Sequence, residues 1–213
     1  MKEMTQGMEK AVLAMGCFWS PEALFGSMPG IIRTRTGYTG GTLADPTYRH
    51  MGDHSEAIEL EYDPDELPYE EIVRVFWENH NPANINDYKG RQYQSMLLYR
   101  TPEQKDDIEQ VLKARRAAGK PEPATEVKPF TVFYPAEERH QKYYLKRHPD
   151  ALKKLAALYL SIAEMDRTTL AARLNGLAKG YTNRSRILEE ISDWPLPVME
   201  QERIAARIKE IRW

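Results

Sequence analysis

Cys17 is the only cysteine of the chain, and its position suits a reactive thiol. It follows the apolar run 10–16, which predicts a buried strand, and it precedes the segment 19–28, which predicts a helix. In that helix Ser20 is the predicted N-cap and Pro21 takes the first helical position. Unpaired N–H groups and the dipole at a helix N-terminus lower the pKa of a thiol below its usual value of about 8.5. A buried structural thiol is the alternative that this position leaves open, because free cysteines are often buried.

Two histidines and a glutamate form a second group that could do chemistry. His50 and His54 are four residues apart, with Glu56 nearby, and on a helix this spacing could gather three zinc ligands. The interval contains Gly52 and Asp53 and lacks an apolar period, so we predict no metal site there. Taken alone, Glu56 is a solvated carboxylate at the edge of a strand, because glutamate is rarely buried unpaired.

The elements around these residues alternate between strands and helices. The predicted strands are 10–16, 31–36, 55–62, 95–99 and 130–134, and the predicted helices are 19–28, 68–80, 101–118 and a short one over 135–148. In the strand 55–62, Ile58 and Leu60 alternate with Glu59 and Glu61, which predicts that the glutamates face solvent. Two strands follow each other between the first two helices, so we predict an α+β fold, a two-layer α/β sandwich with a mixed sheet.

Beyond Pro149 the strand signals stop and apolar residues recur at helical spacing. We therefore predict two parts, a catalytic domain over 1–148 and a C-terminal helical extension over 149–213 that docks on it through its apolar faces. The 30 Lys and Arg residues nearly balance the 32 Asp and Glu residues, so we expect no nucleic-acid partner. No run of about 20 apolar residues and no export signal is seen, so we expect a cytoplasmic protein that does not bind membranes.

Several motifs in one order resemble those of the peptide-methionine (S)-S-oxide reductases, the A-type methionine sulfoxide reductases. They are Gly16-Cys-Phe-Trp19, Thr36-Gly-Tyr-Thr-Gly-Gly41, Pro46-Thr-Tyr48, Gly52-Asp-His-Ser-Glu56, Tyr62-Asp-Pro64, Phe76-Trp-Glu-Asn-His80 and Gln92-Tyr93. The resemblance covers about two-thirds of the chain, from Ala11 to about His148. These enzymes reverse the oxidation of methionine. The resemblance therefore implies thiol-dependent reduction of methionine (S)-sulfoxide, with no cofactor.

The resemblance also implies roles for four residues that would meet the sulfoxide. Cys17 is the nucleophile that attacks the sulfur, and Glu56 is the proton donor to the oxygen. Tyr48 and Tyr93 are the phenols that hydrogen-bond this oxygen. Such roles are chemically sound, because the oxygen must be protonated before it leaves and an acid with a raised pKa can protonate it.

Four further residues are implied to shape the binding site. Phe18 and Trp19 resemble the apolar wall that holds the substrate methyl group, and His54 resembles a position that orients the acid or its loop. Family members commonly have an aspartate five residues before the second tyrosine. Here Tyr88 takes that place, and Asp87, one position earlier, is the candidate for the role.

The chain departs from many family members because it lacks the further cysteines near the C-terminus that resolve the oxidised thiol. The sulfenic acid left on Cys17 would have to be reduced by an external thiol, either thioredoxin or glutathione with glutaredoxin. The sequence does not choose between them, nor does it decide whether free methionine sulfoxide is a substrate beside the peptide-bound form.

Two other functions are compatible with these residues. One is a redox-sensing or binding module that uses the same pocket without efficient turnover. The other is an acyl-transferring thiol hydrolase in which His54 or His140 activates Cys17, and this function requires one of the two histidines within hydrogen-bonding distance of the thiol.

Overall fold

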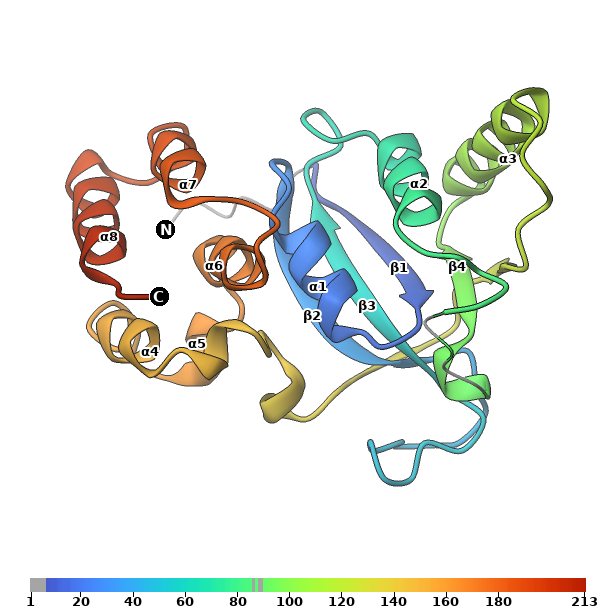
Figure 1. Cartoon of the computed structure of the whole chain (residues 1–213), viewed down its shortest axis with the longest axis horizontal. Helices are drawn as coiled ribbons and strands as arrows, with labels where there is room; N and C mark the ends of the chain where they lie inside the picture. The colour runs from blue at the N-terminus through green and yellow to red at the C-terminus, as the bar shows by residue number, and fades with distance from the viewer. Residues whose placement is uncertain (1–6, 86, 88–89) are drawn as a thin grey trace.

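A six-stranded sheet in the order β5-β4-β1-β3-β2-β6 forms the centre of the molecule (Figure 1). The computed structural model describes residues 7–85, 87 and 90–213. The strands are β1 (Glu9–Met15), β2 (Ile31–Thr39), β3 (Ser55–Tyr62), β4 (Ser95–Tyr99), β5 (Glu126–Pro129) and β6 (Phe133–Pro135). Strands β4 and β5 are parallel, and the other paired strands are antiparallel. The prediction of a mixed sheet in an α+β fold is confirmed.

Helices α1, α2 and α3 pack on one face of the sheet, and α4 to α8 gather beside it (Figure 1). Their bounds are α1 (Trp19–Gly26), α2 (Tyr69–Glu78), α3 (Pro102–Ala117), α4 (Pro149–Leu155), α5 (Ile162–Met165), α6 (Thr169–Lys179), α7 (Arg184–Ile191) and α8 (Val198–Glu210). Three short 3-10 turns, η1 (Arg91–Tyr93), η2 (Glu138–His140) and η3 (Leu145–Arg147), connect them. The last five helices enclose an apolar cluster of their own.

The two faces of the sheet follow from the alternation of side chains along each strand. Ala11, Leu13 and Met15 of β1 point to the helix-covered face and belong to the main apolar core. Ala14 points the other way and packs with Ala57 on the opposite face. The helices and the sheet thus make the two layers that the sequence predicts.

Three of the predicted elements differ in the structure. Helix α1 begins at Trp19 with Phe18 as its N-cap, so Ser20 is not the cap and instead exchanges a hydrogen bond of 2.8 Å with the phenol of Tyr144. Residues 130–134 are not one strand, because the chain forms β5 before them and the short β6 at their end. The segment 135–148 is not a helix and contains only the turns η2 and η3.

Of the two glutamates of β3 that the alternation predicts to face solvent, Glu61 is partly exposed and pairs with Arg33, whereas Glu59 is buried. Glu59 is only 7% exposed and bonds to Arg35, with Lys10 and Arg100 both 3.9 Å away. Cations on and next to the neighbouring strands therefore cover this carboxylate. The alternation along a single strand cannot predict contacts between strands.

The C-terminal extension docks on the helix that follows Cys17. Gly176 of α6 faces α1, and a Cβ built on it would lie 2.5 Å from the Cβ of Ser27 and 2.9 Å from the carbonyl oxygen of Ala23. Arg173, one turn earlier in α6, is buried and donates to the carbonyl oxygen of Gly26 at 2.9 Å. The predicted docking of the extension is confirmed. Helix α6 lies too close to α1 to admit a side chain at Gly176.

A buried ion pair joins α1 to the segment between η2 and η3. Both Glu22 and Lys142 have no exposed side-chain surface, and the ammonium donates to the carboxylate at 2.7 Å and to the carbonyl oxygen of Thr34 at 2.8 Å. The backbone N–H of Lys142 donates to the other oxygen of Glu22 at 2.9 Å. All charged groups of the pair are thereby satisfied, as burial of charge requires.

Replacing one partner of this pair should destabilise the protein strongly. Lys142→Met keeps the unbranched apolar part of the side chain but leaves a buried carboxylate without its cation, which typically costs about 3–5 kcal/mol of unfolding free energy. Urea denaturation followed by circular dichroism measures the loss. Lys105→Met removes an exposed lysine from α3 and should change stability by no more than about 0.5 kcal/mol. An equally small change for Lys142→Met would contradict this account.

Candidate active site

Cys17 lies in the turn between β1 and α1, and a glycine makes this turn possible. Gly16 has φ +82°, in the left-handed region that favours glycine, and a Cβ there would lie 2.3 Å from a methyl carbon of Ile85. Phe18 caps α1 immediately after the cysteine. The thiol therefore sits at a strand-to-helix junction, as the sequence predicts, and it is partly exposed.

Glu56 is brought next to this turn from the second residue of β3. Its side chain is 1% exposed, and one oxygen accepts the backbone N–H of Phe18 at 3.0 Å. The other oxygen accepts the amide N–H of Gln92 at 2.6 Å. The hydrogen bond to Phe18 ties the carboxyl group to the residue that directly follows Cys17.

Burial raises the pKa of Glu56, and this effect exceeds the opposing one of its two hydrogen-bond donors, Gln92 and Phe18. Desolvation penalises the charged carboxylate, whereas donors stabilise it. The group is therefore easier to protonate than an ordinary glutamate, which is what a proton donor near neutral pH needs.

The pKa of the Cys17 thiol is raised to about 11, which corrects the expectation of a lowered value. Burial is the largest cause, and the negative charge of Glu56 adds to it, while a backbone hydrogen bond from Trp19 acts in the opposite direction. The helix N-terminus thus supplies the expected stabilisation, but desolvation outweighs it. At neutral pH the resting thiol carries its proton.

The two predicted phenols lie together beside the acid. Tyr48 hydrogen-bonds with Tyr93 and Gln92, and its pKa is raised by burial first and then by the charges of Glu56 and Cys17. Tyr48 therefore remains a neutral hydrogen-bond donor at physiological pH. The structure brings together four of the residues that the sequence analysis selected: Cys17, Glu56, Tyr48 and Tyr93.

Phe18 and Trp19 form an aromatic wall with residues from distant parts of the chain. The ring of Phe18 is 6.4 Å from that of Trp19 and 5.4 Å from that of His140. Trp19 stacks on Tyr143, with ring centres 3.8 Å apart and planes 5° from parallel. Phe18 is only 1% exposed, whereas Trp19 is partly exposed and lines the groove at Cys17. Trp19 therefore presents an apolar surface that can hold a methyl group, and both rings exclude water from the neighbouring acid.

His54 and Asp87 occupy less direct positions. His54 is buried, and its ring nitrogens bond to the N–H of Gly41 at 3.2 Å and the carbonyl oxygen of Leu43 at 2.8 Å. It therefore fixes the loop after β2 rather than the carboxyl of the acid. Asp87 is exposed, has φ +62°, and bonds to Asn84 through its backbone and its carboxylate. Tyr88, the alternative position for the family's aspartate, lies outside the described residues.

Three residues near the site have positions that the sequence does not indicate for methionine sulfoxide reduction, although His140 is the candidate base of the hydrolase alternative. Gln92 bridges the acid and Tyr48, although its place beside Tyr93 in a recognised motif was a usable signal. His140 is 5% exposed and lies 4.6 Å from the Tyr48 ring, so it is part of the site's wall. Glu137 accepts the backbone N–H of Tyr48 at 3.2 Å, which helps to position that phenol. No periodicity of the sequence indicates the last two contacts.

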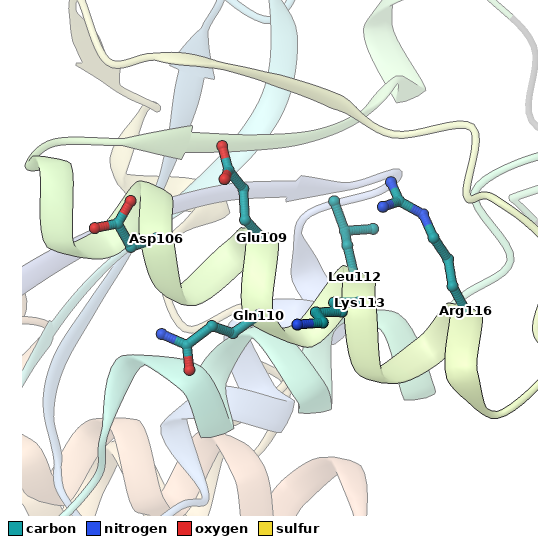
Figure 2. Close-up of a pocket in the computed structure, with 6 residues that line it drawn as sticks. All are labelled: Asp106, Glu109, Gln110, Leu112, Lys113 and Arg116. Atoms are coloured by element: carbon teal, nitrogen blue, oxygen red, sulfur yellow. The ribbon is translucent and has the colours of Figure 1, made fainter.

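A groove of about 350 Å³ opens on Cys17 from the side of the helical extension. The described residues that line it are Met15, Cys17, Trp19, Ser20, Pro21, Leu24, Asn79, His80, Asn81, Asn84, Ile85, Tyr144, Lys179 and Tyr181. A second hollow runs along the outer side of α3, where charged side chains such as Glu109, Lys113 and Arg116 surround it (Figure 2). It contains none of the residues selected for chemistry.

No group of three His, Cys, Asp or Glu side chains within 7–85, 87 and 90–213 is arranged to hold a metal ion. Of the helices in this described part of the chain, none is both long and apolar enough to cross a bilayer.

Comparison with known proteins gives consistent matches. Residues 9–171 match the family model of peptide methionine sulfoxide reductase. The chain is 36% identical over 211 residues to peptide methionine sulfoxide reductase A5 of Oryza sativa subsp. japonica, covering 88% of this chain and 78% of the rice protein. It is 40% identical over 171 residues to the peptide methionine sulfoxide reductase of Drosophila melanogaster, covering 80% and 68% of the two chains.

Two solved structures share the fold. Methionine sulfoxide reductase A of Corynebacterium diphtheriae superposes with a TM-score of 0.59 at 30% identity, over 69% of this chain and 78% of that one. The reduced form of Mxr1 from Saccharomyces cerevisiae superposes with a TM-score of 0.61 at 25% identity, over 70% and 90% of the two chains. The match of the family model, the two relatives and the shared fold establish that this chain belongs to the peptide methionine sulfoxide reductase family.

Proposed function

We propose that this protein reduces methionine (S)-sulfoxide to methionine and that the oxygen leaves on Cys17 as a sulfenic acid. One observation carries the proposal: the buried carboxyl group of Glu56 accepts the backbone N–H of Phe18, the residue directly after the only cysteine of the chain. Membership of the family supports the reaction type, and peptide-bound methionine sulfoxide is the substrate named for the relatives.

The raised pKa values of the thiol and the acid suit a coupled transfer. Moving one proton from Cys17 to Glu56 creates a thiolate and a carboxylic acid without changing the charge of the site. It also removes the negative charge of Glu56, which is one cause of the raised thiol pKa. The thiolate can then attack the sulfoxide sulfur while the acid protonates the oxygen, so that the single negative charge of the resting site, on Glu56, moves to Cys17 only for the reaction.

The remaining residues serve the sulfoxide group in this proposal. Tyr48 and Tyr93 donate hydrogen bonds to the oxygen as its negative charge increases, and Phe18 and Trp19 contact the methyl group. Methionine departs, and the sulfoxide oxygen remains on sulfur as Cys17–SOH. Sulfur of the substrate gains two electrons, and sulfur of Cys17 loses two.

Two equivalents of an external thiol complete the cycle. The first displaces water from the sulfenic acid to form a mixed disulfide, and the second releases Cys17 as a thiol. A thioredoxin or glutathione with glutaredoxin can supply them, and such thiols are kept reduced in the cytoplasm, where we place the enzyme. Free methionine (S)-sulfoxide presents the same reacting group and is a second substrate in this proposal.

The hydrolase alternative has less support, because both ring nitrogens of His54 bond to the loop after β2 and a nitrogen of His140 accepts a hydrogen bond from Arg139. Turnover of separated sulfoxide epimers with dithiothreitol tests the proposal directly. We expect methionine from the S epimer only. Absence of turnover, or equal turnover of both epimers, would overturn it.

Removing the hydroxyl of one phenol should slow the reaction without abolishing it. Tyr48→Phe deletes a donor to the oxygen, and the loss of one hydrogen bond to a developing charge lowers kcat/KM by about 10- to 100-fold. Tyr159→Phe, in the helical extension, is the matched control and should leave the rate unchanged. Steady-state kinetics with the S epimer measure both, and an unaltered rate for Tyr48→Phe would exclude the role.

A further inference from the structure

The groove beside Cys17 is formed by two parts of the chain that are distant in sequence. One wall carries the amides of Asn79, Asn81 and Asn84, from the segment that follows α2. The other wall comes from the C-terminal region and carries Lys179 and Tyr181 at the end of α6. The groove therefore exists because the helical extension is docked on α1.

Lys179 supplies the formal charge of this groove among the described lining residues. The other titratable base there is His80, whose pKa is lowered by burial and which is therefore neutral at physiological pH. The carboxylate of Asp87 bonds to Asn84 but is not part of the described lining. A cation in a groove whose other described polar groups are neutral favours a small anion, in particular a carboxylate.

The position of Lys179 is fixed through α1. Its ammonium lies 4.8 Å from the centre of the Tyr144 ring, and the phenol of Tyr144 is hydrogen-bonded to Ser20 at 2.8 Å. Ser20 is in the first turn of α1, three residues after Cys17. Helix α6, which ends with Lys179, is held against α1 by the close approach at Gly176. The helix that ends with the exposed Lys179 and the helix that follows Cys17 are thus packed together.

We propose that this groove binds a small carboxylate-bearing thiol of the glutathione class, with a carboxylate on Lys179 and the thiol directed at Cys17. The inference rests on the function proposed above, because it concerns the reduction of the Cys17 sulfenic acid. The chain has no second cysteine to do this, so the reducing thiol must come from outside. The volume of about 350 Å³ lies within the range of about 300–1,000 Å³ that is typical of small-molecule sites.

The chemical step is balanced with two molecules of the thiol. The first attacks the sulfur of Cys17–SOH and forms an S–S bond. The hydroxyl of the sulfenic acid leaves as water, together with the proton of the attacking thiol. The second attacks the bound molecule's sulfur, the Cys17 thiolate leaves and is protonated, and the symmetrical disulfide departs. Two thiols are oxidised for each methionine sulfoxide reduced.

Reversing the charge of Lys179 tests this site. For Lys179→Glu we expect the KM for glutathione to rise by about 3- to 10-fold, the scale of removing and reversing one exposed charge contact. The readout is the ratio of glutathione-supported to dithiothreitol-supported turnover, because dithiothreitol has no carboxylate. Asn81→Asp, which places a negative charge on the opposite wall, should lower the same ratio.

Lys113→Glu makes the same change of charge on α3, in the hollow of Figure 2, and should leave the ratio unaltered. Mass spectrometry of the oxidised protein with glutathione should show one mixed disulfide on Cys17. An unaltered ratio in both groove variants, or turnover only with a protein dithiol, would overturn the inference. A burst of methionine without any reductant, measured on the same samples, tests the proposed function separately, because it does not involve the second thiol.

Discussion

Cys17→Ser should reduce the turnover of methionine (S)-sulfoxide to the uncatalysed level. The chain has one cysteine, so no other thiol can take over the attack on sulfur. A serine hydroxyl is a far weaker nucleophile than a thiol and does not form a stable counterpart of the sulfenic acid. Production of methionine from the S epimer, with dithiothreitol in excess, measures the loss.

The free energy of unfolding of Cys17→Ser serves as the control for this variant. Cys17 is partly exposed, and the substitution exchanges one atom for another of similar size, so the free energy of unfolding should change by no more than about 1 kcal/mol. Thermal denaturation followed by circular dichroism provides that value. A folded Cys17→Ser protein that still reduces the sulfoxide would remove the basis of the proposed reaction.

Glu56→Gln should slow the chemical step by about 10²- to 10⁴-fold, the usual contribution of a positioned acid. The amide keeps the size of the side chain and can still contact Gln92 and the N–H of Phe18, but it has no proton to give to the oxygen. Single-turnover kinetics at neutral pH measure this step. Glu61→Gln on the same strand, paired with Arg33, is the matched control and should react at the normal rate.

The unsubstituted protein should have a pH dependence of kcat/KM that both groups set. In the unsubstituted protein the active form has a thiolate and a carboxylic acid, and it carries as many protons as the resting form with a thiol and a carboxylate. The ratio of the two forms does not depend on pH, so kcat/KM should be flat between the raised pKa of Glu56 and the Cys17 pKa of about 11. It should fall below the first value and above the second.

Removing the charge of Glu56 should also lower the pKa of Cys17, because that charge contributes to its elevation. The rate of alkylation by iodoacetamide follows the thiolate, and with one cysteine in the chain the signal has one source. We expect the midpoint of this rate to move to lower pH in Glu56→Gln. An unmoved midpoint would show that the two groups are not coupled.

The burial of Glu56 was predictable from the sequence, but only by counting along the strand. Glu56, Ile58 and Leu60 are two residues apart and therefore share one face of β3, which is the face that packs on the helices. A solvated position at the strand edge is not compatible with the face that Glu56 shares with Ile58 and Leu60. The pKa of Cys17 was not predictable, because the helix N-terminus is a local feature whereas the desolvation that outweighs it comes from the whole fold.

The segment 135–148 shows the same limit. Its composition favours a helix, yet Lys142 has φ +50° and its side chain reaches Glu22 of α1. Gln141 bonds through both ends of its amide to the backbone of Thr36 in β2. These contacts join residues that are about a hundred positions apart in the sequence, so no local sequence pattern can predict them. They replace the helical hydrogen bonds and bring His140 to the active site.

A single turnover without a reductant tests whether Cys17 takes the oxygen of the sulfoxide. The reduced protein is mixed with an excess of the S epimer, the methionine released is counted, and the sulfenic acid is trapped with dimedone and mapped by mass spectrometry. We expect one methionine and one trapped Cys17 for each chain, and no methionine from the R epimer. Methionine released without an adduct on Cys17 would contradict it.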